Sequence, residues 1–311
     1  MGKTLFVSTY YNNPAFMGLQ LACLREFVRG EWDFRVVNDA GDDTRCLFSG
    51  AAATVEIERE AERLRLVCER VPQGVHENES RGGLVPDGLP ASHPTERHRA
   101  CLHWIFKNHK RLGFDGYDHF VLMESDMFFA KEVNAREYFS GHDITAPMRK
   151  GCELVRTGDP DQYWPERIKG VERITVDFFP MYFFAVDMRV VKNLETINIG
   201  GFAGTDTGGQ TCFFLEDNPG YTVFPMLMSD TREYQVQFIS KTRPDESAEI
   251  IHYRAGSNWD CQSKDYYDEK LERLFEAFIP GVKTRSTAAT TVELKSRDGQ
   301  HSFLPKNRVS S

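Results

Sequence analysis

Short apolar runs alternate with longer segments of helical periodicity through the first part of the chain. Residues 4–7 and 34–37 are short, mostly apolar runs that predict strands, and a polar loop follows each of them. Apolar residues recur at helical spacing over 16–28 and 54–68, which predicts two helices. This order of strand, helix, strand and helix favours a parallel sheet with helices on its faces.

Two stretches interrupt the pattern. Segment 71–94 is rich in Pro, Gly, Glu and Ser and predicts a long loop, and residues 151–173 predict a second irregular stretch. Between them, Pro94 precedes a helix expected over 95–110, which leads into a strand that ends at Glu124. Strands are also expected at 144–146, 221–228, 235–239 and 249–253, helices at 212–215 and 266–278, and an apolar run covers 177–186, where Pro180 marks an edge or a bulge.

Together these elements predict an α/β fold with a Rossmann-like, mostly parallel central sheet flanked by helices and a smaller mixed region. The 311 residues allow one large domain or two smaller ones, and 41% hydrophobic and 12% aromatic residues are enough for a sizeable core. From Lys283 onward the chain is polar and weakly patterned. We therefore expect a tail or surface arm over 284–311.

Charge and cysteine usage narrow the class of protein. The formal net charge of −8 argues against a nucleic-acid-binding protein, which usually carries a basic face. Seven scattered cysteines without a CxxC pair indicate reduced core thiols rather than a disulfide framework or a zinc site. The sequence shows no signal-peptide pattern and no run near the roughly 18 apolar residues of a transmembrane segment. We expect a cytoplasmic protein, soluble or peripherally bound to a membrane.

The candidate chemistry centres on the run 119–129, where a short apolar strand ends in two carboxylates. Glu124 and Asp126 are two residues apart, so in an extended chain both side chains point to the same side. Two acidic groups beside apolar segments repel each other and lose hydration, and a divalent cation such as Mg²⁺ or Mn²⁺ relieves both costs. The alternative is a fully solvated acidic turn after an edge strand.

Polar residues follow three of the predicted strands. Because ligands bind outside the carboxyl ends of strands in an open α/β sheet, these three ends would form one crevice. An aromatic ring and an amide there can hold a base, an Asp can accept from the base or ribose, and a carboxylate pair with a metal can hold a diphosphate. The residues are Thr9, Tyr10 and Tyr11 after the first strand, Asn38 and Asp39 after the second, and Glu124 and Ser125 after the third.

The order of these segments resembles the nucleotide-sugar glycosyltransferases of the GT-A fold. The resemblance lies in residues 9–12, 36–40 and 122–128, and in the order of elements it covers residues 4–260. The signature of that family is an Asp-x-Asp at a strand end, which binds Mn²⁺ or Mg²⁺ on the donor diphosphate. This chain has Glu at the first position, so Asp126 is expected as a direct metal ligand and Glu124 as a ligand or as a contact through water or the ribose.

The resemblance also implies roles for residues late in the chain. His252 resembles the late histidine that closes the metal shell in several GT-A families, and a core histidine is the alternative. Arg254 has the planar fork that suits a phosphate. Asp206 lies in the glycine-rich segment 200–209, which resembles the acceptor-side loop near the transferred sugar, and a helix N-cap is its alternative.

Two basic residues begin the helix predicted over 95–110. Arg97 and His98 are expected near the pyrophosphate, because helix N-termini attract anions. A solvated basic helix face is the alternative. Trp164, in the second irregular stretch, is a candidate for stacking on an acceptor sugar.

The resemblance implies a glycosyltransferase, that is, a hexosyl- or pentosyltransferase that moves a sugar from a UDP- or GDP-linked donor to a hydroxyl, on a glycan or another acceptor. It implies one GT-A-like catalytic domain over 1–283, with a nucleotide-binding half over 1–130 and an acceptor half over 131–283. Asp206 would be the general base of an inverting enzyme, or would position the donor sugar in a retaining one.

Two other classes stay open. A nucleotidyltransferase that forms a nucleotide sugar shares the crevice and the metal, but usually carries a basic glycine-rich loop that residues 8–14 lack. A non-catalytic carbohydrate- or nucleotide-binding protein on the same fold would keep the core without turnover. A Rossmann dehydrogenase is disfavoured because no GxGxxG follows the first strand.

Overall fold

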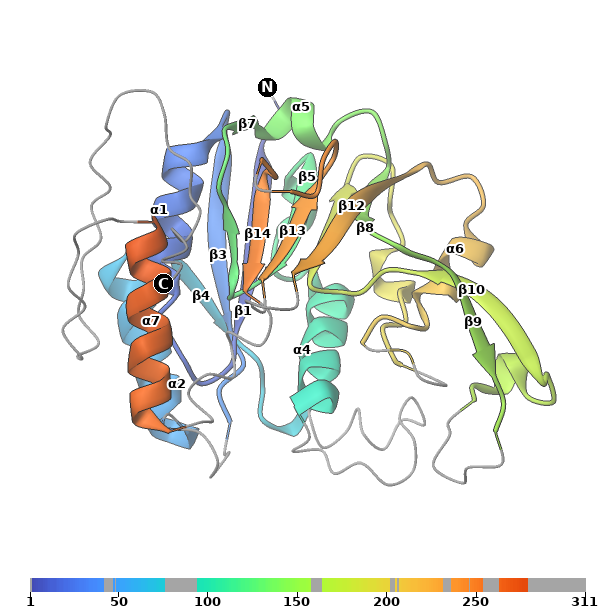
Figure 1. The fold of residues 1–311 in the computed structure, drawn as a ribbon, viewed down its shortest axis with the longest axis horizontal. Coiled ribbons are helices and arrows are strands. Elements are labelled where there is room, and N and C mark those ends of the chain that lie inside the picture. Colours follow the sequence, from blue (N-terminus) through green and yellow to red (C-terminus); the bar gives the residue numbers. More distant parts are fainter. Residues whose placement is uncertain are drawn as a thin grey trace, which may run out of the picture.

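A ten-stranded mixed sheet forms the centre of the computed structural model, with helices on both of its faces (Figure 1). The structure describes residues 2–41, 47, 49–75, 94–157, 164–201, 205, 207–231, 236–245, 247–253 and 263–278. The strands lie in the order β4-β3-β1-β5-β11-β8-β12-β13-β14-β6. They are β1 (Thr4–Tyr10), β3 (Trp32–Asn38), β4 (Val67–Arg70), β5 (His119–Glu124), β6 (Met127–Phe129), β8 (Ile144–Pro147), β11 (Phe183–Asp187), β12 (Val223–Thr231), β13 (Val236–Ser240) and β14 (Ile250–Tyr253).

The helices and two small sheets surround this central sheet. The α-helices are α1 (Met17–Phe27), α2 (Gly50–Arg63), α4 (Pro94–Asn108), α5 (Ala135–Phe139), α6 (Thr211–Asp217) and α7 (Lys264–Phe278). Short 3₁₀ turns lie at η1 (Phe114–Gly116), η2 (Glu166–Ile168) and η3 (Leu194–Thr196). One small sheet pairs β2 (Val28–Arg29) with β7 (Val133–Asn134), and the other pairs β9 (Arg149–Val155) with β10 (Arg173–Phe178).

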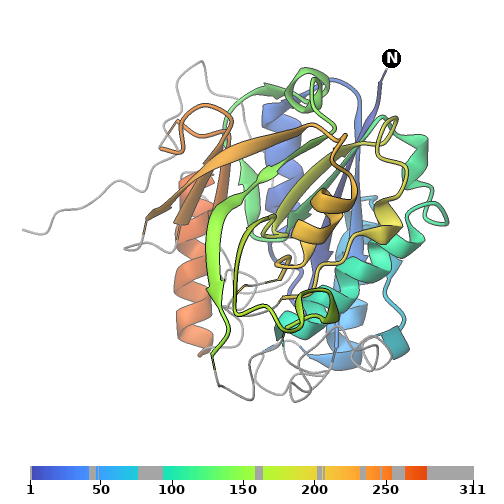
Figure 2. The same cartoon turned by 90° about the vertical axis from the view of Figure 1, so that its right-hand side faces the viewer.

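Helices bury both faces of the first strands, which explains the uninterrupted apolar runs in the sequence. All seven residues of β1 are buried. Phe6 belongs to a core that includes α1, α2 and α7, whereas its neighbours Leu5 and Val7 belong to a second core with α4. The split follows from the alternation of side chains along a strand. Figure 2 shows α7 and α4 on opposite sides of the molecule.

The predicted α/β class, with a large central sheet flanked by helices, is confirmed. The strands β4, β3, β1 and β5 are parallel neighbours, as the alternation of strands and helices predicts. The rest of the sheet contains more antiparallel strand pairs than the sequence pattern indicates. Strand β11 is antiparallel to β5 and β8, β12 is parallel to β8, and β12, β13, β14 and β6 are antiparallel in turn.

The sheet curls because only two residues join its fourth and tenth strands. Strand β5 ends at Glu124 and β6 begins at Met127. Three residue steps span at most about 11 Å, whereas six strand spacings in a flat sheet would span about 29 Å. The edge formed by β14 and β6 therefore folds back toward the end of β5. This curl brings the late part of the chain to the predicted carboxylate pair.

The predicted irregular stretch at 151–173 is wrong in part, since β9 and β10 form an antiparallel ribbon that projects from the body (Figure 1). Most side chains of β9 are exposed, so the strand shows no apolar alternation in the sequence. The ribbon packs on α6 around a small separate core. Trp164 is partly buried and packs against that core, and its predicted stacking on an acceptor sugar stays a prediction.

The second helix ends earlier than its apolar spacing predicts. Helix α2 stops at Arg63, and residues 67–70 form β4 instead of a last helical turn. Arg65 adopts a left-handed conformation with φ of 58°, and the Leu66 N–H donates to the carbonyl of Ala61 at 2.8 Å. Such an ending usually falls on glycine. An arginine in that conformation gives no signal in the sequence.

The described cysteines are free thiols. Cys23, Cys101 and Cys212 are buried free thiols, as predicted, while Cys46 and Cys261 lie outside the described residues. None of the described helices has both the length and the apolar character needed to cross a bilayer. The predicted tail at 284–311 lies outside the described residues, and the division into two halves and the cytoplasmic location stay predictions.

A buried histidine makes the stability of this fold sensitive to acid. His119 begins β5 and is 1% exposed. Among the described residues, neither of its ring nitrogens finds a hydrogen-bond partner. Burial lowers the pKa of His119, and the nearby carboxylates of Asp187 and Asp118 oppose this shift only in part. The folded protein therefore holds His119 in its neutral form.

We predict that stability falls as the pH drops below about 6.5, because the unfolded chain then takes up a proton at His119 that the folded chain excludes. H119L removes this difference at similar side-chain size. Urea unfolding at pH 7.5, 6.0 and 5.0 should give a smaller loss of unfolding free energy for H119L than for the wild type. Equal losses in the two proteins would contradict this assignment.

Candidate functional site

The turn between β5 and β6 carries both candidate carboxylates. Strand β5 is buried up to Met123, ends at Glu124, and is followed by Ser125 and Asp126. Asp126 is 1% exposed, and Glu124 is half-buried. A carboxylate this deeply buried needs compensation of its charge. The alternative of a fully solvated acidic turn is therefore wrong.

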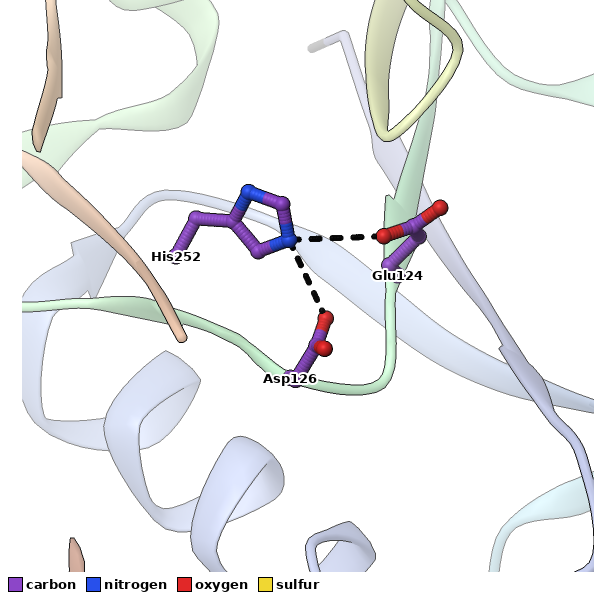
Figure 3. A group of neighbouring side chains, drawn as sticks. All are labelled: Glu124, Asp126 and His252. Atoms are coloured by element: carbon purple, nitrogen blue, oxygen red, sulfur yellow. Dashed lines mark ion pairs between the residues drawn. The ribbon is translucent and has the colours of Figure 1, made fainter. Parts of the chain in front are cut away.

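His252 of β14 completes a three-residue cluster (Figure 3). Its Nε2 lies 3.4 Å from Glu124 Oε2 and 3.4 Å from Asp126 Oδ1. One ligand atom from each residue lies within 4.8 Å of the others. The antiparallel pairing of β14 with β6 sets His252 opposite Met127, and the Tyr253 N–H donates to the Asp126 carbonyl at 2.9 Å. The side chain is 5% exposed.

The cluster fits a small divalent cation. At 3.4 Å, the separations between His252 Nε2 and the two carboxylates are longer than ordinary hydrogen bonds of about 2.7–3.2 Å. A cation with ligands at about 2.0–2.3 Å holds neighbouring ligand atoms roughly 3 Å apart. Carboxylates are usual ligands of Mg²⁺ and Mn²⁺, and an imidazole favours a transition metal, so the donor set suits Mn²⁺ better than Mg²⁺.

Gln237 of β13 lies behind His252 and controls which ring nitrogen faces the carboxylates. Its Oε1 lies 3.2 Å from His252 Nδ1, and both side chains are buried. An amide oxygen can only accept, so Nδ1 carries a proton in this pair and Nε2 is the nitrogen left to bind a cation. Burial alone would lower the pKa of His252, but the carboxylates of Asp126 and Glu124 outweigh it and raise that pKa to about 9. A proton on His252 thus balances the carboxylates where no cation does.

The helix α4 contributes a second imidazole to the site. His98 Nε2 lies 3.5 Å from Glu124 Oε1, on the other oxygen from the one that faces His252. Glu124 is therefore located between two histidines. The predicted position of His98 near a pyrophosphate stays a prediction.

Arg97, the neighbour of His98, is bound to the chain itself. Its guanidinium donates to the carbonyls of Asp39 and Ala40 at 2.8–3.1 Å and lies over the Tyr11 ring at 5.2 Å. A Cβ added at Gly41 would lie 2.0 Å from this guanidinium, so a larger residue there would require Arg97 to move. These contacts tie α4 to the end of β3. They give no support to the predicted contact between Arg97 and a pyrophosphate.

Tyr10 is a core residue in this structure, and the position of its side chain gives no support to the predicted nucleotide contact. The side chain is fully buried, and its hydroxyl donates to Gln20 Oε1 at 2.8 Å. Gln20 in turn donates from Nε2 to the carbonyls of Glu124 and Met127, at 2.9 Å each. Tyr10 therefore contacts the carboxylate turn through Gln20.

The other predicted strand-end residues have mixed outcomes. Asn38 is buried, donates to the Thr54 carbonyl at 3.1 Å and accepts from the Ala40 N–H at 3.0 Å, so it holds the turn after β3. The roles predicted for four further residues in nucleotide binding stay predictions. Of these, Thr9, Asp39 and Ser125 are buried and Tyr11 is half-buried.

Asp206 and Arg254 lie outside the described residues, so their roles stay predictions. At Gly208 the backbone approaches a neighbouring segment closely. Gly208 has φ of +101°, and a side chain there would lie 2.0 Å from the Phe179 carbonyl oxygen. The segment after Asp206 is therefore packed against the chain that leads into β11.

Gln20 and Gln237 are the residues of the site that sequence reasoning missed. Each is a buried amide that makes hydrogen bonds at a position that the apolar pattern assigns to the core: Gln20 in the helical stripe of 16–28 and Gln237 in the strand at 235–239. A buried polar side chain needs partners, so a polar residue in an apolar stripe is the signal that points to such positions.

Comparisons with known proteins give weak likenesses. No protein-family model and no curated protein matches the chain. Among solved structures, apo mouse xyloside xylosyltransferase 1 is 12% identical with a TM-score of 0.39, over 72% of this chain and 84% of that one. The mannosyltransferase Ktr4p from S. cerevisiae is 11% identical with a TM-score of 0.34, over 60% and 56% of the two chains. The apo bifunctional glycosyltransferase WbbM is 11% identical with a TM-score of 0.33, over 60% and 32%. Because all three scores lie below 0.5, the functional proposal depends on the residues of this chain.

We predict that Gln237 raises the affinity of the cluster for Mn²⁺ by fixing His252. Q237L removes the acceptor of the Nδ1–H, and the Mn²⁺ dissociation constant should rise about 10- to 100-fold. Q237E keeps an acceptor oxygen at the same place and should stay within a few-fold of the wild type. Isothermal titration calorimetry with MnCl₂ measures both. Equal affinities for Q237L and the wild type would show that Gln237 does not act on a metal ligand.

Proposed function

We propose that this protein is a metal-dependent glycosyltransferase of GT-A type, which moves a sugar from a nucleotide-diphosphate sugar to an acceptor hydroxyl. The observation that carries the proposal is the buried cluster of Glu124, Asp126 and His252, with its separations of 3.4 Å. Two carboxylates and an imidazole at a strand end suit a divalent cation that binds a diphosphate.

The position of the cluster in the sheet supports a nucleotide donor. The strands β1, β3 and β5 are parallel, and their register pairs Tyr10 with Asn38 and Thr9 with Glu124. Their carboxyl ends therefore lie side by side, at the edge where open α/β sheets bind ligands. The candidates at this edge for contact with the base and ribose are Thr9, Tyr11 and Asp39. The candidates for binding the diphosphate through a metal are Glu124 and Asp126.

The chemistry requires stabilisation of a departing diphosphate and of an anomeric carbon with oxocarbenium character. A bound Mn²⁺, or Mg²⁺, supplies positive charge that neutralises the leaving diphosphate. Asp126 and His252 would hold that ion, Glu124 would hold it directly or through water or the ribose, and Gln237 would keep Nε2 of His252 available. Asp206 would accept the proton of the acceptor hydroxyl in an inverting reaction, or position the donor sugar in a retaining one.

The partners follow from this chemistry. The donor is a UDP- or GDP-linked sugar and the acceptor a hydroxyl, on a glycan in the most direct version of the proposal. The formal net charge of −8 disfavours a nucleic-acid partner.

We predict that a nucleotide diphosphate stabilises the protein only together with a metal. In thermal-shift measurements with UDP, GDP and their sugars, one nucleotide family should raise the melting temperature with Mn²⁺ and not with EDTA. D126N should abolish this shift, and D115N, which changes an exposed carboxylate on η1, should keep it. Turnover should fall roughly a thousandfold or more in D126N. An undiminished shift and turnover in D126N would contradict the metal assignment.

We predict that Asp206 acts after donor binding. D206N should retain the Mn²⁺-dependent thermal shift with the donor nucleotide and lower turnover about 100-fold or more, because it loses a proton acceptor or a sugar contact without loss of a metal ligand. Release of the nucleotide diphosphate measures turnover. Wild-type turnover in D206N would exclude the role. A wild-type protein that binds nucleotide with metal but never releases product with any acceptor would favour the non-catalytic binding protein.

A further inference from the structure

Gln20 of α1 connects the core of the protein to the backbone of the carboxylate turn. The side chain is 0% exposed, although it stands among the apolar residues of the helix. Its Nε2 donates two hydrogen bonds of 2.9 Å, one to the carbonyl of Glu124 and one to that of Met127. Those carbonyls belong to the residues on either side of Ser125 and Asp126. One amide group therefore bridges both ends of the turn.

The orientation of this amide is fixed by a second buried side chain. Tyr10 is 0% exposed and donates from its hydroxyl to Gln20 Oε1 at 2.8 Å. Because the Tyr10 hydroxyl donates to the Gln20 amide oxygen, that oxygen faces β1 and both amide N–H groups are available to the turn. Burial raises the pKa of Tyr10 well above its usual range, so the hydroxyl remains protonated and able to donate. The three side-chain hydrogen bonds form one chain from β1 through α1 to the turn.

The turn joins β5 and β6, which are the fourth and tenth strands in the order of the sheet, and contacts from several elements hold it in place. Backbone contacts hold it on other sides: the Glu124 N–H donates to the Tyr182 carbonyl at 2.9 Å, and the Asp126 carbonyl accepts from the Tyr253 N–H at 2.9 Å. Gln20 joins the carbonyls of Glu124 and Met127 through one amide group. A change in the separation of these carbonyls would move the residues between them, and with them the Asp126 carboxylate that faces His252. Metal sites are sensitive to such outer contacts, which typically change affinity 10- to 100-fold.

We propose that Gln20 is a positioning residue that holds Glu124 and Asp126 at the separation required for a divalent cation, with Tyr10 as the residue that orients it. The inference rests on the proposed function, since it concerns the same metal site. Tyr10 thus affects the metal site from the core, through its hydrogen bond to Gln20. Gln20 touches neither the cation nor a substrate, and it acts only through the backbone of the turn.

The test compares two buried glutamines that each hold a turn. Q20M keeps the length of the side chain and removes both donors to the turn. Gln210 is the matched control, because it is buried, accepts from Asn198 Nδ2 at 2.7 Å and donates to the Gly201 carbonyl at 3.2 Å, away from the carboxylates. The dissociation constant of MnCl₂ is measured for the wild type, Q20M, Q210M and Y10F, by electron paramagnetic resonance of free Mn²⁺ at a temperature where circular dichroism shows all four folded.

The Mn²⁺ dissociation constant should rise about 10- to 100-fold in Q20M, rise by a smaller factor in Y10F, and remain within twofold of the wild type in Q210M. Wild-type affinity in Q20M would overturn the inference, and so would an equal weakening in Q210M, which would indicate general loosening of the fold. If Q20M does not fold, Y10F decides, since it leaves Gln20 in place and removes only its orienting donor; unchanged affinity in Y10F then overturns the inference. A wild-type protein that binds no Mn²⁺ refutes the proposed function itself, which is a distinguishable result.

Discussion

Two carboxylates held beside each other in a nearly dry environment are the constraint on which the rest of this structure depends. Asp126 is almost inaccessible and Glu124 half-buried, and placing two negative charges beside each other there costs free energy. His252 offsets that cost when it is protonated, which is why the carboxylates raise its pKa to about 9 against the effect of burial. A divalent cation does the same with twice the charge. The cluster is therefore a site prepared for positive charge.

The curl of the sheet is what allows three residues so far apart in sequence to meet. The short link between β5 and β6 forces the antiparallel edge back toward the parallel strands, and pairing of β14 with β6 then sets His252 beside Asp126. Different elements contact the cluster and its turn: His98 of α4 faces Glu124, Gln237 of β13 faces His252, and Gln20 of α1 binds the turn. The carboxylates thus follow a strand of the parallel part of the sheet, whereas His252 and Gln237 lie on antiparallel strands.

The sequence was informative where structure is local and uninformative where it depends on tertiary contacts. Buried strands such as 119–124 and the carboxylates at the end of this strand follow from a short apolar run and a spacing of two. The nearness of His252 came from a resemblance, since no local rule links residues 126 and 252.

The end of α2 was missed because Arg65 takes a conformation typical of glycine. The burial of Tyr10 was not foreseen, because the pattern marks the end of a strand and not which face of the end residue is covered. Gln20 and Gln237 could have been suspected as polar residues in apolar stripes, but their partners are visible only in three dimensions.

The most direct test of the central claim is a crystal structure of the protein grown with MnCl₂, with diffraction data collected at the manganese absorption edge. We expect an anomalous peak at roughly 2.0–2.3 Å from both a carboxylate oxygen of Asp126 and Nε2 of His252, with Glu124 bound directly or through one water. A structure with no such peak, in which His252 Nε2 donates directly to the two carboxylates, would show that the cluster is an internal ion pair and would contradict the metal site.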